Sequence, residues 1–84
     1  MQRGRLFHYR SKAGAEIDFI VEIDDRFIPI EVKWTEHPRE TDARHIIEFM
    51  RHLPDKARHG FVVCRCERPM QIHENILAIP YWAM

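Results

Sequence analysis

The sequence predicts a small α/β (α+β) domain in which one main helix packs on one face of a sheet. Two observations predict this class. Residues 15–23 and 27–34 alternate apolar and polar side chains with a period of two, which is typical of half-buried strands. A later segment, ending near Leu53, carries apolar residues three or four positions apart, which is typical of an amphipathic helix.

Length and composition narrow the class further. With 84 residues, 45% of them hydrophobic and 31% charged, the chain is expected to form one globular domain. Thirteen basic and thirteen acidic residues cancel, which disfavours tight unaided binding to DNA. No apolar run approaches the roughly 20 residues of a membrane span, so we expect a cytoplasmic protein with no membrane contact.

The first half of the chain predicts three strands. Residues 6–10 form a short strand candidate, closed by the turn-prone residues 11–14. The next two strands form an antiparallel hairpin around Asp24-Asp25. Their apolar residues are Ile17, Phe19, Val21 and Ile23 at odd positions, then Ile28, Ile30, Val32 and Trp34 at even positions.

The register of the hairpin follows from its turn. If Asp24-Asp25 is the whole loop, then Asp18 lies opposite Glu31 and Glu16 lies opposite Lys33. This register also brings both apolar sets to one face, which we expect to be buried. A longer loop of the same parity would leave the faces unchanged.

The second half predicts one helix and two strands. A polar loop over 35–39 precedes the helix, which Thr41 or a residue just before Pro38 caps and which Pro54 limits. Residues 61–64 after Gly60, FVVC, form an apolar run around two β-branched valines and predict an interior strand, and residues 76–79 predict a last short strand. The apolar stripe of the helix comprises Ala43, Ile46, Ile47, Met50 and Leu53.

Charged residues of the hairpin form the candidate functional site. Two carboxylates opposed on a sheet, such as Asp18 and Glu31, repel each other unless a cation lies between them. We therefore predict Mg²⁺ or Mn²⁺ bound by Asp18 and Glu31, with the backbone carbonyl of Val32 and water as further ligands. Lys33 would orient an attacking water or stabilise charge on a phosphate. Glu16 is either another ligand or the ion-pair partner of Lys33.

The same pattern has a plainer interpretation. The solvent-facing side of a strand normally carries Glu, Asp and Lys, and an exposed ion pair between Glu16 and Lys33 would contribute about 0 to 1 kcal/mol. Cys64 and Cys66, with His59 or His73, could bind zinc, but their spacing also suits reduced strand cysteines.

Two further groups could touch nucleic acid. Aromatic side chains could stack on bases or belong to the core, and basic ones could contact phosphate or simply be solvated. The aromatic group is Tyr9, Trp34, Tyr81 and Trp82, and the basic group is Arg51, Lys56, Arg58, Arg65 and Arg68.

Two runs of the sequence resemble the core of the PD-(D/E)XK nuclease superfamily: GAEIDFIV at 14–21 and PIEVKW at 29–34. The chain is more closely similar to the uncharacterised domain at the C-terminus of many prokaryotic AAA-type ATPases. That similarity extends through residues 8–10, Phe49-Met50, residues 60–63 and residues 78–82.

The resemblance implies a restriction-endonuclease-like mixed sheet, with metal positions at Asp18 and Glu31 and a catalytic lysine at Lys33. It implies that residues 1–84 are one nuclease-like domain from the C-terminal part of a larger protein, without the N-terminal core helix of the superfamily. Ile17 stands where the superfamily commonly has proline.

The expected function is a divergent metal-dependent phosphodiesterase that acts on DNA beside an ATPase module in the same or a partner chain. One alternative is a non-catalytic nuclease-like module for DNA or protein docking. Another is an interaction fragment that completes its core as a homodimer.

Overall fold

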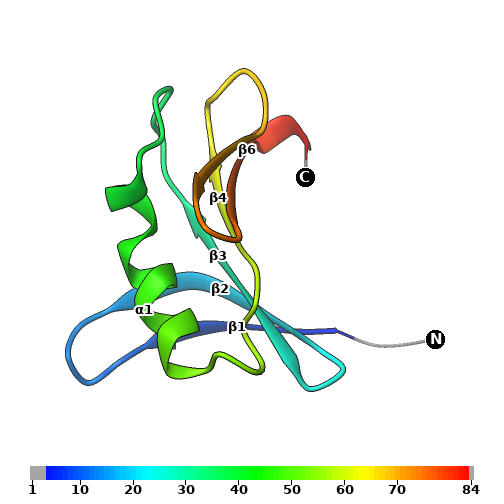
Figure 1. The fold of residues 1–84 in the computed structure, drawn as a ribbon. Helices are drawn as coiled ribbons and strands as arrows, with labels where there is room; N and C mark the ends of the chain where they lie inside the picture. The colour runs from blue at the N-terminus through cyan, green and yellow to red at the C-terminus, as the bar shows by residue number, and fades with distance from the viewer. Residues whose placement is uncertain (1–3, 84) are drawn as a thin grey trace.

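The computed structural model describes residues 4–83 as one six-stranded mixed sheet with a single α-helix on one face (Figure 1). The strands lie in the order β1-β2-β3-β4-β6-β5. Neighbours β1, β2 and β3 are antiparallel, β4 runs parallel to both β3 and β6, and β5 is antiparallel to β6. The predicted fold class is confirmed. The strand bounds are β1 (Arg5–Arg10), β2 (Glu16–Ile23), β3 (Arg26–Val32), β4 (Gly60–Cys64), β5 (Met70–His73) and β6 (Ile76–Pro80).

The helix begins differently from the prediction. A 3₁₀ turn, η1 (Glu40–Ala43), leads into α1 (Arg44–His52), and a second one, η2 (Tyr81–Ala83), follows β6. The Arg39 N–H donates to Oδ2 of Asp42 at 2.9 Å. Asp42, rather than Thr41 or a residue just before Pro38, therefore provides the acceptor for a backbone N–H at the start of η1. Pro54 follows the helix end, as expected. Strand β5 is not among the predicted strands: its four residues, MQIH, do alternate apolar and polar side chains, but the run is short and directly follows the turn-prone Arg68-Pro69.

The hairpin turn is as predicted. The pair Ile23 and Arg26 closes a two-residue loop, and the register continues to Phe19 opposite Ile30. Asp24 and Asp25 have φ angles of 53° and 62°, the left-handed conformation that a tight hairpin turn of this length requires. Aspartate tolerates this conformation better than most residues, so the turn forms without glycine.

A β-bulge breaks the period of two in β2. Phe7 pairs with Ile20 and Tyr9 with Ile17, so two residues of β2 lie opposite the one residue between them in β1. As a result Ile17 and Ile20, three positions apart, are both fully buried in one cluster with Phe49 of α1.

The prediction of which face is buried is wrong. The two apolar sets of the hairpin do share a face beyond the bulge, but α1 covers the opposite one, where Ile20 pairs with Pro29 and Gly60 meets Ile46. Alternation fixes which residues share a face, not which face a helix covers. We call the uncovered side the open face; its strand residues are Phe19, Val21, Ile23, Ile28, Ile30, Val32, Phe61, Val63, Leu77 and Ile79.

The core lies between α1 and the other face of the sheet. One cluster joins Ile46 to β4 and β6, and the second joins Phe49 to β2 and Ala57. Tyr9 packs edge-on against Phe49, with ring centroids 5.0 Å apart, so it belongs to this core. Within residues 4–83, no helix is both long enough and apolar enough to cross a bilayer.

Candidate functional site

The predicted carboxylates lie where strands β2 and β3 part. Their backbone pairing ends at Phe19 and Ile30; beyond it β2 stays paired with β1, and β3 stays paired with β4. In Figure 1 the two strands diverge from this region, with α1 on the side into which they open. Asp18 and Glu31 are the next residues in register. We call the group of Asp18, Glu31, Val32 and Lys33 the fork.

Reciprocal hydrogen bonds hold the two carboxylates of the fork. The Asp18 N–H donates to Oε1 of Glu31, and the Val32 N–H donates to Oδ2 of Asp18, both at 2.9 Å. Each side chain therefore accepts a bond from the backbone of the other strand. The remaining oxygens, Oδ1 of Asp18 and Oε2 of Glu31, accept no hydrogen bond from the described residues.

These hydrogen bonds take the place of backbone hydrogen bonds between β2 and β3. A backbone N–H that loses its strand partner needs another acceptor, and the bulge and the divergence together deprive two such groups of theirs. Carboxylates are strong acceptors for this purpose. In a strand the N–H and C=O of one residue point the same way, so the Val32 carbonyl also faces the fork.

Glu31 is the one buried charged residue among those described, with 6% of its surface exposed. Burial raises the pKa of the Glu31 carboxyl, and the negative charge of Asp18 raises it further, against the opposing effects of the Asp18 N–H and Lys33. The Lys33 ammonium lies 4.0 Å from Oε2 of Glu31 and is half exposed. The fork thus combines a buried acid with an accessible cation.

Glu16 lies outside this group. Its carboxylate forms an ion pair with Arg10 at 2.7 Å, and these two residues are partners in the β1–β2 ladder. The predicted pair of Glu16 with Lys33 is therefore wrong, because β2 turns toward β1 before Glu16 is reached. The ring Nδ1 of His45 lies 2.9 Å from the Glu16 carbonyl oxygen, which ties the first turn of α1 to this end of β2.

The other predicted ligand groups do not come together. Cys64 and Cys66 are buried in the core cluster under α1, while His59 precedes the opposite end of β4. Burial raises the pKa of the Cys64 thiol, which favours its protonated form. Among residues 4–83, no three His, Cys, Asp or Glu side chains gather as a metal site, so the fork offers two carboxylates rather than three.

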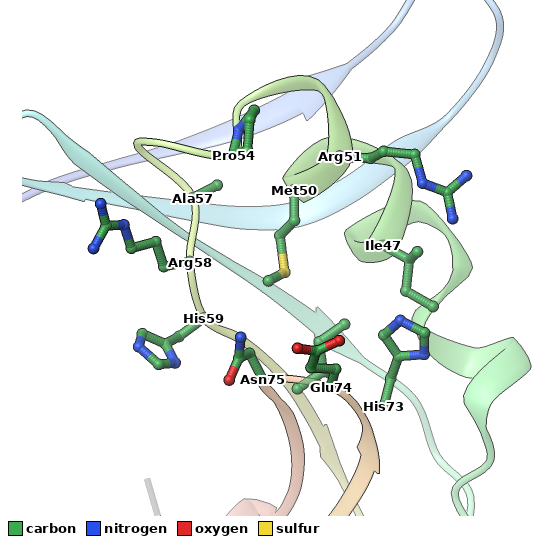
Figure 2. A pocket seen from close by; sticks show the side chains of 11 residues that line it. Ile47, Met50, Arg51, Pro54, Ala57, Arg58, His59, His73, Glu74 and Asn75 are labelled. Atoms are coloured by element: carbon green, nitrogen blue, oxygen red, sulfur yellow. The ribbon is translucent and has the colours of Figure 1, made fainter.

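A cavity of about 490 Å³ lies elsewhere, between the end of α1, the following loop and the β5–β6 turn, and no residue of the fork lines it. Its lining combines apolar side chains such as Met50 with polar ones such as His73 and Glu74. Figure 2 shows that the side chains of Arg51 and Arg58 extend away from its centre on opposite sides. These two members of the predicted basic group therefore do not converge on the cavity.

The bulge that shapes the fork was not predicted. Its signal in the sequence is weak: two apolar residues, Ile17 and Ile20, lie three positions apart, a spacing that strict alternation does not produce. Side-chain patterns also cannot predict which backbone N–H groups donate to the two carboxylates.

Comparison with known proteins identifies one family. Residues 1–84 match the family model described as "Domain of unknown function (DUF4143)". Neither the curated proteins nor the solved structures give a match.

Proposed function

The chain belongs to the DUF4143 family of domains of unknown function, and from the fork we propose that it is a divergent metal-dependent phosphodiesterase domain that acts on DNA. The observation that carries the proposal is the reciprocal bonding of Asp18 and Glu31, which fixes two carboxylates side by side and leaves one oxygen of each unused. The resemblance to PD-(D/E)XK nucleases supports DNA as the substrate and an ATPase module as the neighbour.

The donor set suits a hard divalent cation. Mg²⁺ is commonly held by one or two carboxylates and several waters, so two side chains suffice. Asp18 and Glu31 would hold Mg²⁺ or Mn²⁺, with the Val32 carbonyl as a third donor. When bound, such an ion polarises a phosphate and lowers the pKa of an attacking water. It would also offset the burial and the negative charge of Asp18, which together raise the pKa of Glu31.

Lys33 supplies the second element of the chemistry. Its ammonium is anchored near Glu31 at 4.0 Å but remains 44% exposed, so it can reach a phosphate that approaches from solvent. There it would stabilise the negative charge that develops on the phosphate oxygens during attack. The side chain of Lys33 takes no part in the hydrogen bonds of the fork, and its backbone N–H, which donates to the Val63 carbonyl at 2.9 Å, is kept in an alanine variant, so Lys33 can be changed without disturbing the strands.

Calorimetric titration with MgCl₂ and MnCl₂ tests the metal site. We expect saturable binding by the wild type and at least a ~10-fold weaker affinity for Asp18→Asn and Glu31→Gln, since a neutral amide is a poorer ligand than a carboxylate. Both variants can still accept the backbone hydrogen bonds, so they should fold. Glu22→Gln is the matched control, because Glu22 is an acidic residue of β2 that pairs with Arg5 away from the fork.

A cleavage assay on single- and double-stranded DNA tests the reaction. Lys33→Ala should keep metal binding and lose cleavage by roughly two or more orders of magnitude. Unchanged metal affinity in both carboxylate variants would refute the site, and metal-dependent cleavage that survives Lys33→Ala would refute the role of Lys33.

A non-catalytic docking module beside an ATPase is the second candidate. The observation that favours it is that both carboxylates satisfy backbone donors, a structural task that needs no metal. This candidate predicts the same fold, no cation-dependent cleavage, and no effect of Lys33→Ala on any measured activity. The same two assays therefore separate the candidates.

A further inference from the structure

The open face of the sheet is a continuous apolar surface. Backbone register places nine of its ten strand residues, together with Leu6 of β1, in three rows that cross the strands. None of these residues is charged; the tenth, Ile23, lies at the edge of the face opposite the exposed Arg26. The rows are Leu6–Val21–Ile28, Phe19–Ile30–Phe61–Leu77 and Val32–Val63–Ile79.

Aromatic side chains extend this surface. Trp34 stacks edge-on against Tyr81, with ring centroids 5.7 Å apart. In Figure 1, η2, which carries Tyr81 and Trp82, lies on the other side of β4 and β6 from α1. These three aromatic residues are 54–70% exposed, and Phe19 and Leu77 are 39% exposed. Such a concentration of aromatic and aliphatic surface is typical of an interface.

The topology of the sheet calls for a second layer here. Strands β3, β4 and β6 run parallel, and parallel strands are found with both faces covered. The described residues supply one such layer, α1, and it lies on the other face.

We propose that a second copy of this chain covers the open face, in a two-fold dimer in which the two sheets pack face to face. A symmetric contact sets the same patch against itself, which suits the three uncharged rows because no like charges then oppose each other within them. The formal net charge of zero also removes long-range repulsion between copies. Packed sheets of this kind lie about 10 Å apart.

The area agrees with a dimer. At about 200 Å² for a whole aromatic side chain, the exposed parts of Phe19, Trp34, Tyr81 and Trp82 amount to roughly 450 Å². Exposed Leu6, Val32 and Leu77 and the half-buried residues of the face bring the total toward the ~800 Å² per partner of a standard interface. Of the fork, only Val32 belongs to the three rows, and the side chains of Asp18, Glu31 and Lys33 lie outside them.

Sedimentation velocity on the full chain from about 1 to 200 µM tests this proposal. We expect a mass of twice 10.2 kDa at the upper end and dissociation on dilution. Leu77→Lys places a charge on the open face, at the β6 end of the row that begins with Phe19, on a side chain already partly exposed, and should weaken association at least ~10-fold. Met70→Lys is the matched control, because Met70 is 46% exposed but pairs with Ala78 of the covered face.

Tryptophan fluorescence gives a second measurement that does not depend on the variants. Burial of Trp34 and Trp82 should reduce quenching by acrylamide as the concentration rises. A chain that stays monomeric to 200 µM, with quenching independent of concentration, would overturn the proposal. Equal association of the Leu77→Lys and Met70→Lys variants, both folded by circular dichroism, would overturn the choice of face.

Discussion

At the scale of one residue, Glu31 combines a stabilising hydrogen bond with a destabilising buried charge. Its Oε1 completes the backbone bonding of β2, and its burial beside Asp18 makes the ionised form costly. Local conflict of this kind is expected at functional positions.

The pH dependence of stability should reveal this conflict. The folded-state pKa of Glu31 is raised above the ordinary value of 4.5, so the folded chain binds the proton more tightly than the unfolded chain. The free energy of unfolding therefore falls as the pH rises from that value through the raised pKa, and the loss persists at neutral pH. Glu31→Gln should remove the loss and be more stable than the wild type at pH 7, by on the order of 1 kcal/mol.

Urea unfolding in the presence of EDTA, at pH 3.5 and pH 7, provides the measurement. The charges that face Glu31 are those of Asp18 and Lys33, and both remain in the variant. Glu22→Gln should show no comparable gain. A Glu31→Gln variant less stable than the wild type at pH 7 would contradict the assignment of the raised pKa.

Gly60 limits how closely α1 can approach the sheet. A Cβ at this position would lie 2.5 Å from Cγ2 of Ile46, a fully buried side chain. Gly60→Ala should therefore cost about 1–3 kcal/mol in the free energy of unfolding. Gly4→Ala is the control, since its Cβ would come no closer than 3.2 Å to Ile23. Equal urea midpoints for the two variants would show that α1 shifts without cost.

The sequence is enough to predict that Asp18 lies opposite Glu31, but not that the two strands diverge beside them. Counting back from Asp24-Asp25 correctly places Asp18 across from Glu31, because a two-residue loop fixes the register. The same count fails for Glu16, because it assumes that the two strands stay together. The divergence depends on β1 and β4 competing for the outer edges of the hairpin, which is a tertiary effect.

At the scale of the element, the hairpin turn carries avoidable strain. Both Asp24 and Asp25 have positive φ, where Asn-Gly is the preferred sequence. The double change Asp24→Asn and Asp25→Gly should stabilise the chain by roughly 1 kcal/mol, measured by thermal unfolding. The lost ion pair of Asp25 with Lys56 is exposed and should matter little, which Lys56→Gln can verify. A lower melting temperature for the double variant would show that the aspartates contribute more than their conformation costs.

The elements also show what periodicity can predict. The helix stripe correctly identified Ile46 and its partners as core, because a single amphipathic helix has one apolar side to bury. The strands were harder, since β3 is apolar on both sides, with Phe27 and Pro29 toward α1 and Ile28 and Ile30 on the open face. A strand of this kind contains no information about which side a helix will cover.

At the scale of the whole molecule, the mixed sheet joins two halves whose strands are connected differently. Strands β1 to β3 form a local meander, whereas β4, β5 and β6 attach through the parallel pairing of β3 with β4. The class was predictable because hairpin and helix have distinct periods. The strand order was not predictable, because it depends on pairing between distant segments, and β5 was not because its run is too short to stand out.

The bonding within the fork has a consequence for how relatives of this chain should diverge. Asp18 and Glu31 each accept a hydrogen bond from the backbone of a neighbouring strand, so selection for folding alone would retain an acceptor at both positions, carboxylate or amide, after any chemistry was lost. The side chain of Lys33 makes no such bond and would be free to drift. Across a set of relatives, retention of Lys33 together with acids rather than amides at the positions of Asp18 and Glu31 should therefore distinguish lineages that remain under selection for catalysis from those that keep only the fold.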